Sequence, residues 1–188
     1  IAEDGEILVS GENVMNGYWN DPDATSKTLI NGWVHTGDIG EFDDEDYLKI
    51  TDRKKDILVN AGGDNISPTR VEAKLDIEPE IAQSMLYGDY KNYLVAVIVP
   101  DKDFAINWAK ENSKDQVFES IVKDEDFIKT MKEIVNKVNK NLSVIEQVRK
   151  FILIDHEFTI ENSMMTVSMK VRRFAVKEKY GDQLEKLY

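Results

Sequence analysis

Residues 93–99 read YLVAVIV, and this run constrains the fold more than any other segment of the chain. A strand with one face in water alternates apolar and polar side chains, whereas a strand covered on both faces is apolar throughout. We therefore predict a central strand at residues 93–99. A second strand is predicted at residues 81–87, joined to the first by the turn signal Gly88-Asp89, and Pro100 ends the apolar run.

Helical patterns flank these strands. The longest is at residues 125–140, where apolar side chains recur with the spacing of one helix face, at Phe127, Ile128, Met131, Ile134, Val135 and Val138. A second helix is predicted to start at Ser67-Pro68, with the serine as N-cap and the proline at the first helical position. A third is predicted at residues 170–180. The pattern predicts the α+β class, with a short sheet flanked by helices.

Charge is distributed unevenly along the chain, whose formal net charge is −12. Residues 1–52 hold thirteen Asp and Glu but two Lys, whereas the rest is nearly balanced. Short strand and turn patterns also fill residues 1–52, including a hairpin at residues 42–51. We therefore predict two structural units, the first of them β-rich. The stretch from Thr166 onward is net basic, which suits a small anionic ligand.

Composition excludes several kinds of site. The chain has no cysteine, which rules out disulfides, thiolate zinc sites and a cysteine nucleophile. It has two histidines, which argues against an imidazole metal site, and its acidity argues against nucleic-acid binding. No apolar run approaches the ~20 residues that cross a bilayer. The chain begins at Ile1 without a signal-peptide pattern, so it either starts inside a longer polypeptide, which we expect, or has been processed. The lack of cysteine fits the cytoplasmic protein that we expect.

Four stretches carry the candidate chemistry. Residues 32–38 read GWVHTGD and, taken alone, predict a glycine turn. Residues 50–56 read ITDRKKD and alone predict a solvated linker. Residues 60–68 read NAGGDNISP, in which adjacent glycines permit positive φ and a close approach of backbone to ligand. Residues 161–173 read ENSMMTVSMKVRR and alone predict the start of a basic surface helix.

Together and in this order, the four stretches resemble the adenylate-forming superfamily. Residues 87–101, YGDYKNYLVAVIVPD, resemble a strand pair of its long-chain acyl-CoA synthetases. The resemblance covers nearly the whole chain. It implies that residues 1–52 are the β-rich end of a large adenylating domain, that residues 53–56 are a hinge, and that residues 57–188 are a small C-terminal lid domain.

The resemblance also implies roles for individual residues. Asp38 would accept hydrogen bonds from the ribose hydroxyls of ATP, which suits an acceptor-only carboxylate. Arg53 would contact the same ribose. Lys55 would be the hinge residue about which the lid turns between two half-reactions. Gly62 and Gly63 would line the tunnel for the pantetheine arm of CoA.

Lys170 matches the catalytic lysine of the superfamily, which bridges the fatty carboxylate and the α-phosphate during adenylation. The chain departs from the family pattern at two nearby positions, with Ser163 where glycine is usual and Val167 where proline is usual. Both changes affect loop stiffness rather than charge. We interpret His35 as a structural neighbour rather than a general base, because an ionised carboxylate attacks ATP directly. His156 is predicted to be a surface residue.

The implied activity is that of an ATP-dependent long-chain fatty acid–CoA ligase, with fatty acid, ATP and CoA as substrates. The phosphate-binding loop and the Mg²⁺ ligands of that family are expected upstream, in the N-terminal domain of the same polypeptide, so we expect this chain alone to be inactive and to hold no metal. Peripheral membrane association of the full enzyme stays open. Two alternatives also stay open: the adenylation domain of another enzyme that passes its acyl group to a carrier protein, and a non-catalytic module of the same fold.

Overall fold

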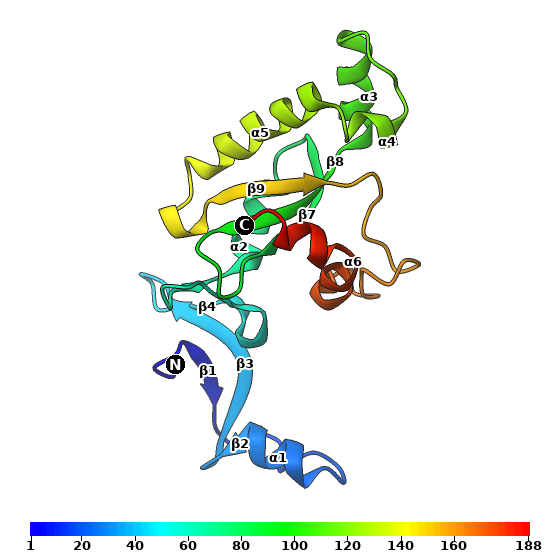
Figure 1. Ribbon diagram of the computed structural model, residues 1–188. Coiled ribbons are helices and arrows are strands. Elements are labelled where there is room, and N and C mark those ends of the chain that lie inside the picture. The colour runs from blue at the N-terminus through cyan, green and yellow to red at the C-terminus, as the bar shows by residue number, and fades with distance from the viewer. The chain divides into compact units, whose positions relative to one another are not determined.

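The computed structural model describes residues 1–188 and divides into two compact units, Ile1–Ile57 and Leu58–Tyr188. Helices and strands are mixed along the chain, which confirms the predicted α+β class (Figure 1). No helix combines the length and the apolar character that crossing a bilayer requires.

The first unit is built around one long strand. Its elements are β1 (Glu6–Val9), α1 (Pro22–Thr28), β2 (Leu29–Ile30), β3 (Trp33–Phe42), β4 (Leu48–Arg53) and the 3-10 turn η1 (Lys54–Asp56). Strand β3 pairs antiparallel with β1, β2 and β4. The β2–β3 turn is Asn31-Gly32, and both residues have positive φ, at 52° and 81°. Such turns match the twist of a hairpin, and Asn-Gly is the pair that adopts them most readily.

The second unit holds a three-stranded sheet with helices on both faces. Its elements are β5 (Leu58–Val59), β6 (Asn65–Ile66), α2 (Pro68–Leu75), β7 (Ile81–Tyr87), β8 (Leu94–Pro100), α3 (Lys102–Glu111), α4 (Phe118–Ile121), α5 (Glu125–Asn139), η2 (Val144–Glu146), β9 (Val148–Leu153) and α6 (Arg173–Glu185). The sheet order is β7-β8-β9, with β8 antiparallel to β7 and parallel to β9. Strand β8 is therefore central, as the apolar run predicts, and all seven of its residues are buried.

The side chains of β8 divide the core of this unit in two. One face of the strand packs against apolar residues of α2, α3 and α5, and the other packs against α6 and the segment before it (Figure 1). The first cluster includes Leu94, Ala96, Ile98, Val71, Leu75, Phe127 and Met131, and the second includes Val95, Val97, Val99, Val176, Tyr180 and Leu184. The helix stripe predicted at residues 125–140 thus lies on the first face of the sheet, except for Ile128, which is 38% exposed, so its place in the stripe was predicted wrongly.

Helix ends follow local chemistry. Ser67 caps α2 by accepting a hydrogen bond from the Arg70 backbone N–H, with Pro68 at the first helical position, as predicted. The predicted start of the last helix is wrong by three residues, because α6 begins at Arg173 and Lys170 belongs to a hairpin instead. The single turn α4 is too short to produce a periodic pattern in the sequence.

Candidate functional site

The first element of the candidate site is a pair of charged residues on adjacent strands. Asp38 of β3 and Arg53 of β4 are cross-strand partners, and Arg53 Nε lies 2.8 Å from Asp38 Oδ1. The Asp38 side chain is 24% exposed and that of Arg53 is 54% exposed. A carboxylate offers about four acceptor sites, so Asp38 can accept further hydrogen bonds while it holds the guanidinium. Residues 33–38 belong to β3 and only Gly32 lies in a turn, so the glycine-turn interpretation is wrong for Thr36-Gly37-Asp38.

A buried carboxylate shapes the backbone next to this pair. Glu6 of β1 is 4% exposed and accepts hydrogen bonds from the Gly37 backbone N–H at 2.9 Å and from Lys54 Nζ at 2.9 Å. His35 Nδ1 also lies 2.9 Å from it. Burial alone would raise the pKa of Glu6, but the hydrogen bonds of His35, Lys54 and Gly37 outweigh it and hold that pKa below its usual value. Ionised Glu6 therefore holds the His35 side chain and the Gly37 backbone N–H, which lie on either side of Thr36. The sequence did not reveal this role.

The charged run at residues 50–56 is folded rather than a free linker. Its first residues belong to β4, where Asp52 is buried, and the Lys54 ammonium is held by Asp4 at 2.6 Å and by Glu6. Lys55, the predicted hinge residue, is exposed in the following 3-10 turn. The solvated-linker interpretation therefore fails for the start of the run. The hinge role of Lys55 stays a prediction.

The second element is the loop that joins β5 to β6. The Asn60 side chain organises it, because its Oδ1 accepts hydrogen bonds from the backbone N–H groups of Gly62 and Asp64, both at 2.9 Å. Gly63 has a φ of +87°, and a Cβ built on it would meet no protein atom within 4 Å. Backbone conformation rather than crowding thus favours glycine at this position. The space beside Gly63 is open, as a loop that lines a ligand path requires.

The third element is the hairpin that carries Lys170. Met165 and Val171 form an antiparallel bridge, and Thr166 closes the loop between them. The Thr166 backbone N–H donates to the Lys170 carbonyl at 2.8 Å, and the Lys170 backbone N–H donates to Thr166 Oγ1 at 3.1 Å. Met169 adopts a φ of 58° in the same loop. The backbone of Lys170 is thereby fixed at both of its polar groups, while its side chain is exposed.

Both departures from the family pattern lie beside this hairpin. Ser163, at the usual glycine position, has a φ of 62°, a left-handed conformation that costs a non-glycine residue free energy. Val167, at the usual proline position, is exposed at the loop itself. Position 163 therefore keeps a backbone conformation that favours glycine, although serine has replaced the glycine.

Helix α2 connects the second element to the third. It begins shortly after the glycine loop, once β6 and the cap Ser67 have passed, and its Glu72 forms a two-fold ion pair with Arg173, the first residue of α6. The N–O distances are 2.6 Å and 2.5 Å. Sequence patterns name both residues within their motifs, but the pair joins positions 101 residues apart, and no local signal predicts it.

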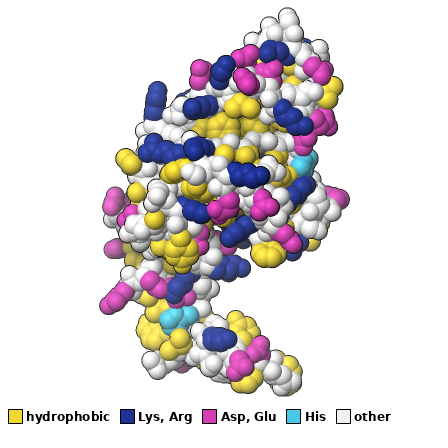
Figure 2. Space-filling view, viewed as in Figure 1, with side chains coloured by type: hydrophobic (Ala, Val, Ile, Leu, Met, Phe, Trp, Pro, Cys, Tyr) yellow, Lys and Arg dark blue, Asp and Glu magenta, His cyan; other side chains and the backbone are white.

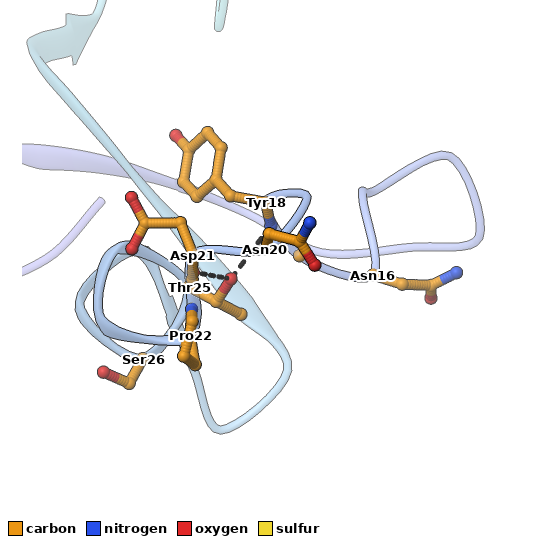
Figure 3. Close-up of a pocket in the computed structure, with 8 residues that line it drawn as sticks. Asn16, Tyr18, Asn20, Asp21, Pro22, Thr25 and Ser26 are labelled. Atoms are coloured by element: carbon orange, nitrogen blue, oxygen red, sulfur yellow. Dashed lines mark hydrogen bonds between the residues drawn. The ribbon is translucent and has the colours of Figure 1, made fainter.

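One pocket lies away from these three elements. An open pocket of about 430 Å³ lies beside α1, where Thr25 Oγ1 accepts from the Tyr18 backbone N–H and donates to the Asp21 carbonyl (Figure 3). None of the predicted site residues lines it. No group of three or more His, Cys, Asp or Glu side chains is arranged to hold a metal ion. Figure 2 shows Lys and Arg side chains interspersed with Asp and Glu on the face in view.

The predicted residues therefore form three local elements. Asp38 and Arg53 meet in the first unit, and Gly62 with Gly63 and Lys170 occupy two loops of the second unit. His35 contacts Glu6, in agreement with a structural position. The His156 side chain is 38% exposed, which agrees with a position on the surface, and it contacts Asp155 and the Tyr180 hydroxyl.

Comparison with proteins of known sequence finds similarity along the whole chain. The long-chain-fatty-acid–CoA ligase FadD15 of Mycobacterium tuberculosis is 37% identical over 190 residues, which cover 100% of this chain and 32% of the relative. The human long-chain-fatty-acid–CoA ligase 6 is 34% identical over 189 residues, which cover 98% of this chain and 27% of the relative. The chain thus spans about a third of the length of the curated relatives it matches.

Comparison with solved structures leads to the same superfamily. The adenylation domain of a carboxylate reductase from Mycobacterium chelonae superposes with a TM-score of 0.80 at 28% identity, over 98% of this chain and 27% of that chain. The family described as AMP-binding enzyme C-terminal domain matches residues 55–188. Since that match covers well over half of the sequence, the chain belongs to the family of AMP-binding enzyme C-terminal domains.

Proposed function

We propose that this chain is the C-terminal part of an ATP-dependent long-chain fatty acid–CoA ligase. The observation that carries the proposal is the similarity, over the full length of the chain, to relatives named as long-chain-fatty-acid–CoA ligases. The reaction has two steps. A carboxylate oxygen attacks the α-phosphorus of ATP and expels pyrophosphate, and the CoA thiol then attacks the acyl carbon and expels AMP.

In this proposal Asp38 and Arg53 hold the nucleotide ribose. The geometry fits that ligand, because Asp38 keeps acceptor capacity for hydroxyl donors after it has bound Arg53 Nε. The guanidinium fixes the orientation of the carboxylate, and the buried Glu6 fixes the backbone at Gly37 beside it. A ligand with two adjacent hydroxyl groups would thus meet an acceptor that is already oriented.

Lys170 supplies positive charge in the first step. Its exposed ammonium is carried on a hairpin whose backbone is fixed on both sides of the lysine. A compact ammonium on a flexible stem can contact both the carboxylate and the α-phosphate, and it stabilises the charge that develops on the phosphate oxygens. The proton stays on the ammonium throughout, since the attacking carboxylate is already ionised.

The second step uses the other loop of the lid. Gly62 and Gly63 present backbone without side chains, so the pantetheine arm can pass close to them. Lys55 is exposed beside Lys54, which is tied to the first unit through Asp4 and Glu6. We place the hinge at Lys55 because it directly follows Lys54, whose ammonium is held by these two ion pairs.

Further parts of the proposal lie outside this chain. The phosphate-binding loop and the Mg²⁺ ligands are assigned to the N-terminal domain, and the chain alone is expected to be inactive. When bound there, Mg²⁺ would supply positive charge to the phosphates. A cytoplasmic location is part of the proposal, and peripheral membrane association belongs to surfaces of the whole enzyme.

One alternative keeps specific support. The carboxylate reductase relative is an adenylation domain, so transfer of the acyl group to a carrier protein is the second candidate function. The higher identity to the two CoA ligases favours CoA as acceptor. A non-catalytic module of the same fold is the third candidate, and the presence of Asp38, Arg53 and Lys170 argues against it.

The test is ATP–pyrophosphate exchange with palmitate, measured on this chain, on the full-length protein and on its Lys170→Ala variant. We expect exchange in the full-length protein alone and a loss of about 100- to 1,000-fold in the variant. Lys132→Ala, on the exposed side of α5, is the matched control and should exchange normally. Undiminished exchange in Lys170→Ala would refute the assigned role, and acyl transfer to a carrier protein but not to CoA would favour the second candidate.

A further inference from the structure

Glu72 is a charged residue in an environment where charge requires a partner. It lies in α2, is 8% exposed, and faces the start of α6. Glutamate is almost never buried to this extent unless its carboxylate is paired. Its carboxylate accepts hydrogen bonds from two residues that are distant in sequence, the Leu86 backbone N–H in β7 and the Arg173 side chain.

The contacts of Glu72 form a rigid arrangement. Glu72 Oε1 accepts from the Leu86 backbone N–H at 2.7 Å and from Arg173 Nη1 at 2.6 Å, and Oε2 accepts from Arg173 Nη2 at 2.5 Å. Two parallel N–H···O bonds between a guanidinium and a carboxylate fix direction as well as distance. The Leu86 bond ties the same carboxylate to the central sheet, so Arg173 is held against the sheet rather than against a mobile side chain.

Arg173 lies three residues after Lys170, at the end of the lysine hairpin. The strand that enters the hairpin is anchored by the buried side chains of Met164 and Met165. The strand that leaves it runs through Arg172, whose backbone N–H donates to the Met164 carbonyl at 2.7 Å. Arg173 is the next residue. The hairpin is therefore held by apolar packing on one side and by the Glu72 ion pair on the other.

We infer that Glu72 is a positioning residue for Lys170 and acts through the Arg173 guanidinium. The inference rests on the proposed role of Lys170 in adenylation. The short strand β6 and the cap Ser67 are all that separate the Gly62-Gly63 loop from α2, so the same ion pair fixes the adenylation loop to the helix that closely follows the thioester loop. Both loops are thereby attached to one support and move as one body when the lid turns.

The most informative variant is Arg173→Lys in the full-length protein. It retains the positive charge and leaves Glu72 bonded to Leu86, but an ammonium cannot form the two-fold pair. We expect faster amide hydrogen exchange at Lys170 and Arg172, with protection at Leu86 unchanged. Glu78→Gln, which breaks the Lys137–Glu78 ion pair of 2.6 Å in the same unit, is the matched control and should leave exchange at Lys170 unchanged.

Kinetics separate positioning from stability. In Arg173→Lys and in Glu72→Gln we expect adenylation to fall about 10- to 100-fold, as a small misplacement of a charged group can cause. Thioester formation from pre-formed acyl-adenylate and CoA should be retained in Arg173→Lys. A parallel loss of both half-reactions would show a general folding role and overturn the inference, as would normal adenylation in Arg173→Lys.

The Lys170→Ala variant, measured alongside, keeps the two proposals apart. If Lys170→Ala retains adenylation, the proposed function of the lysine fails whatever Arg173→Lys does. If Lys170→Ala is inactive while Arg173→Lys is fully active, the proposed function stands and the positioning role of Glu72 is wrong.

Discussion

Asp38 and Arg53 face each other across the β3–β4 ladder and are joined by an ion pair of 2.8 Å between Arg53 Nε and Asp38 Oδ1. The pair forms within the protein itself and needs no ligand to bring it together. Because both residues sit on paired strands, their separation is set by the ladder rather than by a loop. If the pair binds the nucleotide as proposed, its geometry is set before the ligand arrives.

Asp38→Asn separates a structural role of this pair from a binding role. Arg53 is more than half exposed, so the ion pair contributes less than about 1 kcal/mol to the free energy of unfolding. Loss of a charged acceptor for two hydroxyls should nevertheless raise the KM for ATP of the full-length protein about 10-fold or more. Denaturation midpoints and ATP titrations of the exchange rate provide the two measurements. A large stability loss with unchanged KM would show that the pair is merely structural.

Gly63→Ala tests the glycine loop through its backbone. A φ of +87° is unfavourable for alanine, so we expect a loss of about 1 kcal/mol in the free energy of unfolding and a slower thioester step, with adenylation retained. Gly181→Ala is the opposite case, because Gly181 lies inside α6 and a Cβ there would meet only Lys177 Cγ, at 3.8 Å. That variant should gain about 0.5–1 kcal/mol. Urea denaturation of both variants checks the signs, and stabilisation by Gly63→Ala would contradict the strain argument.

Ser163→Gly should relieve strain beside the lysine hairpin. Ser163 is exposed and has a φ of 62°, which costs a side-chain-bearing residue about 1–2 kcal/mol. Glycine removes that cost but loses more chain entropy on folding, about 0.5–1 kcal/mol. We expect a net gain of up to about 1 kcal/mol, measured as a shift in the urea midpoint. Ser168→Gly, within the hairpin loop and without a positive φ, should give no gain and serves as the comparison.

Glu6 makes the first unit sensitive to acid. Its pKa is held below the usual value of 4.5, so the ionised form stabilises the fold above that pH and the stabilisation is lost as the pH falls through the lowered pKa. Glu6→Gln should remove this part of the pH dependence and leave buried donors without a charged acceptor, at a cost of about 1–3 kcal/mol near neutral pH. Amide exchange of Gly37, whose N–H donates to Glu6, reports the effect by NMR. Parallel acid profiles for wild type and variant would rule out this role.

Local patterns predicted much of the second unit. The apolar run at β8, the stripe of α5 and the Ser67 cap of α2 each depend on residues within one element, and each was confirmed apart from Ile128 of the stripe, which is exposed. Such features are set by periodicity and by hydrogen bonds within one turn. The start of α6 was misplaced because Lys170 and its neighbours form a hairpin, whose bridge joins Met165 and Val171.

Contacts between distant residues could not be predicted in this way. Glu6 is one acidic residue among many in the first 52, and nothing in its neighbourhood indicates that it binds the Gly37 backbone. The Glu72–Arg173 pair likewise joins two motifs that are far apart in the chain, and no sequence spacing predicts that they meet. Motif resemblance named most of the candidate residues, but only the folded chain shows which of them hold one another.

The central strand β8 also has a consequence for synthesis. One of its faces, with Val95, Val97 and Val99, is covered by the segment that contains the lysine hairpin and α6, which leaves the ribosome long after the strand itself. In the interval, an uncharged apolar strand has one face without cover, the kind of segment that promotes misassembly of nascent chains. Packing of the segment that contains Lys170 therefore covers this face of β8. A chain whose β8 is covered on both faces also has the lysine hairpin folded.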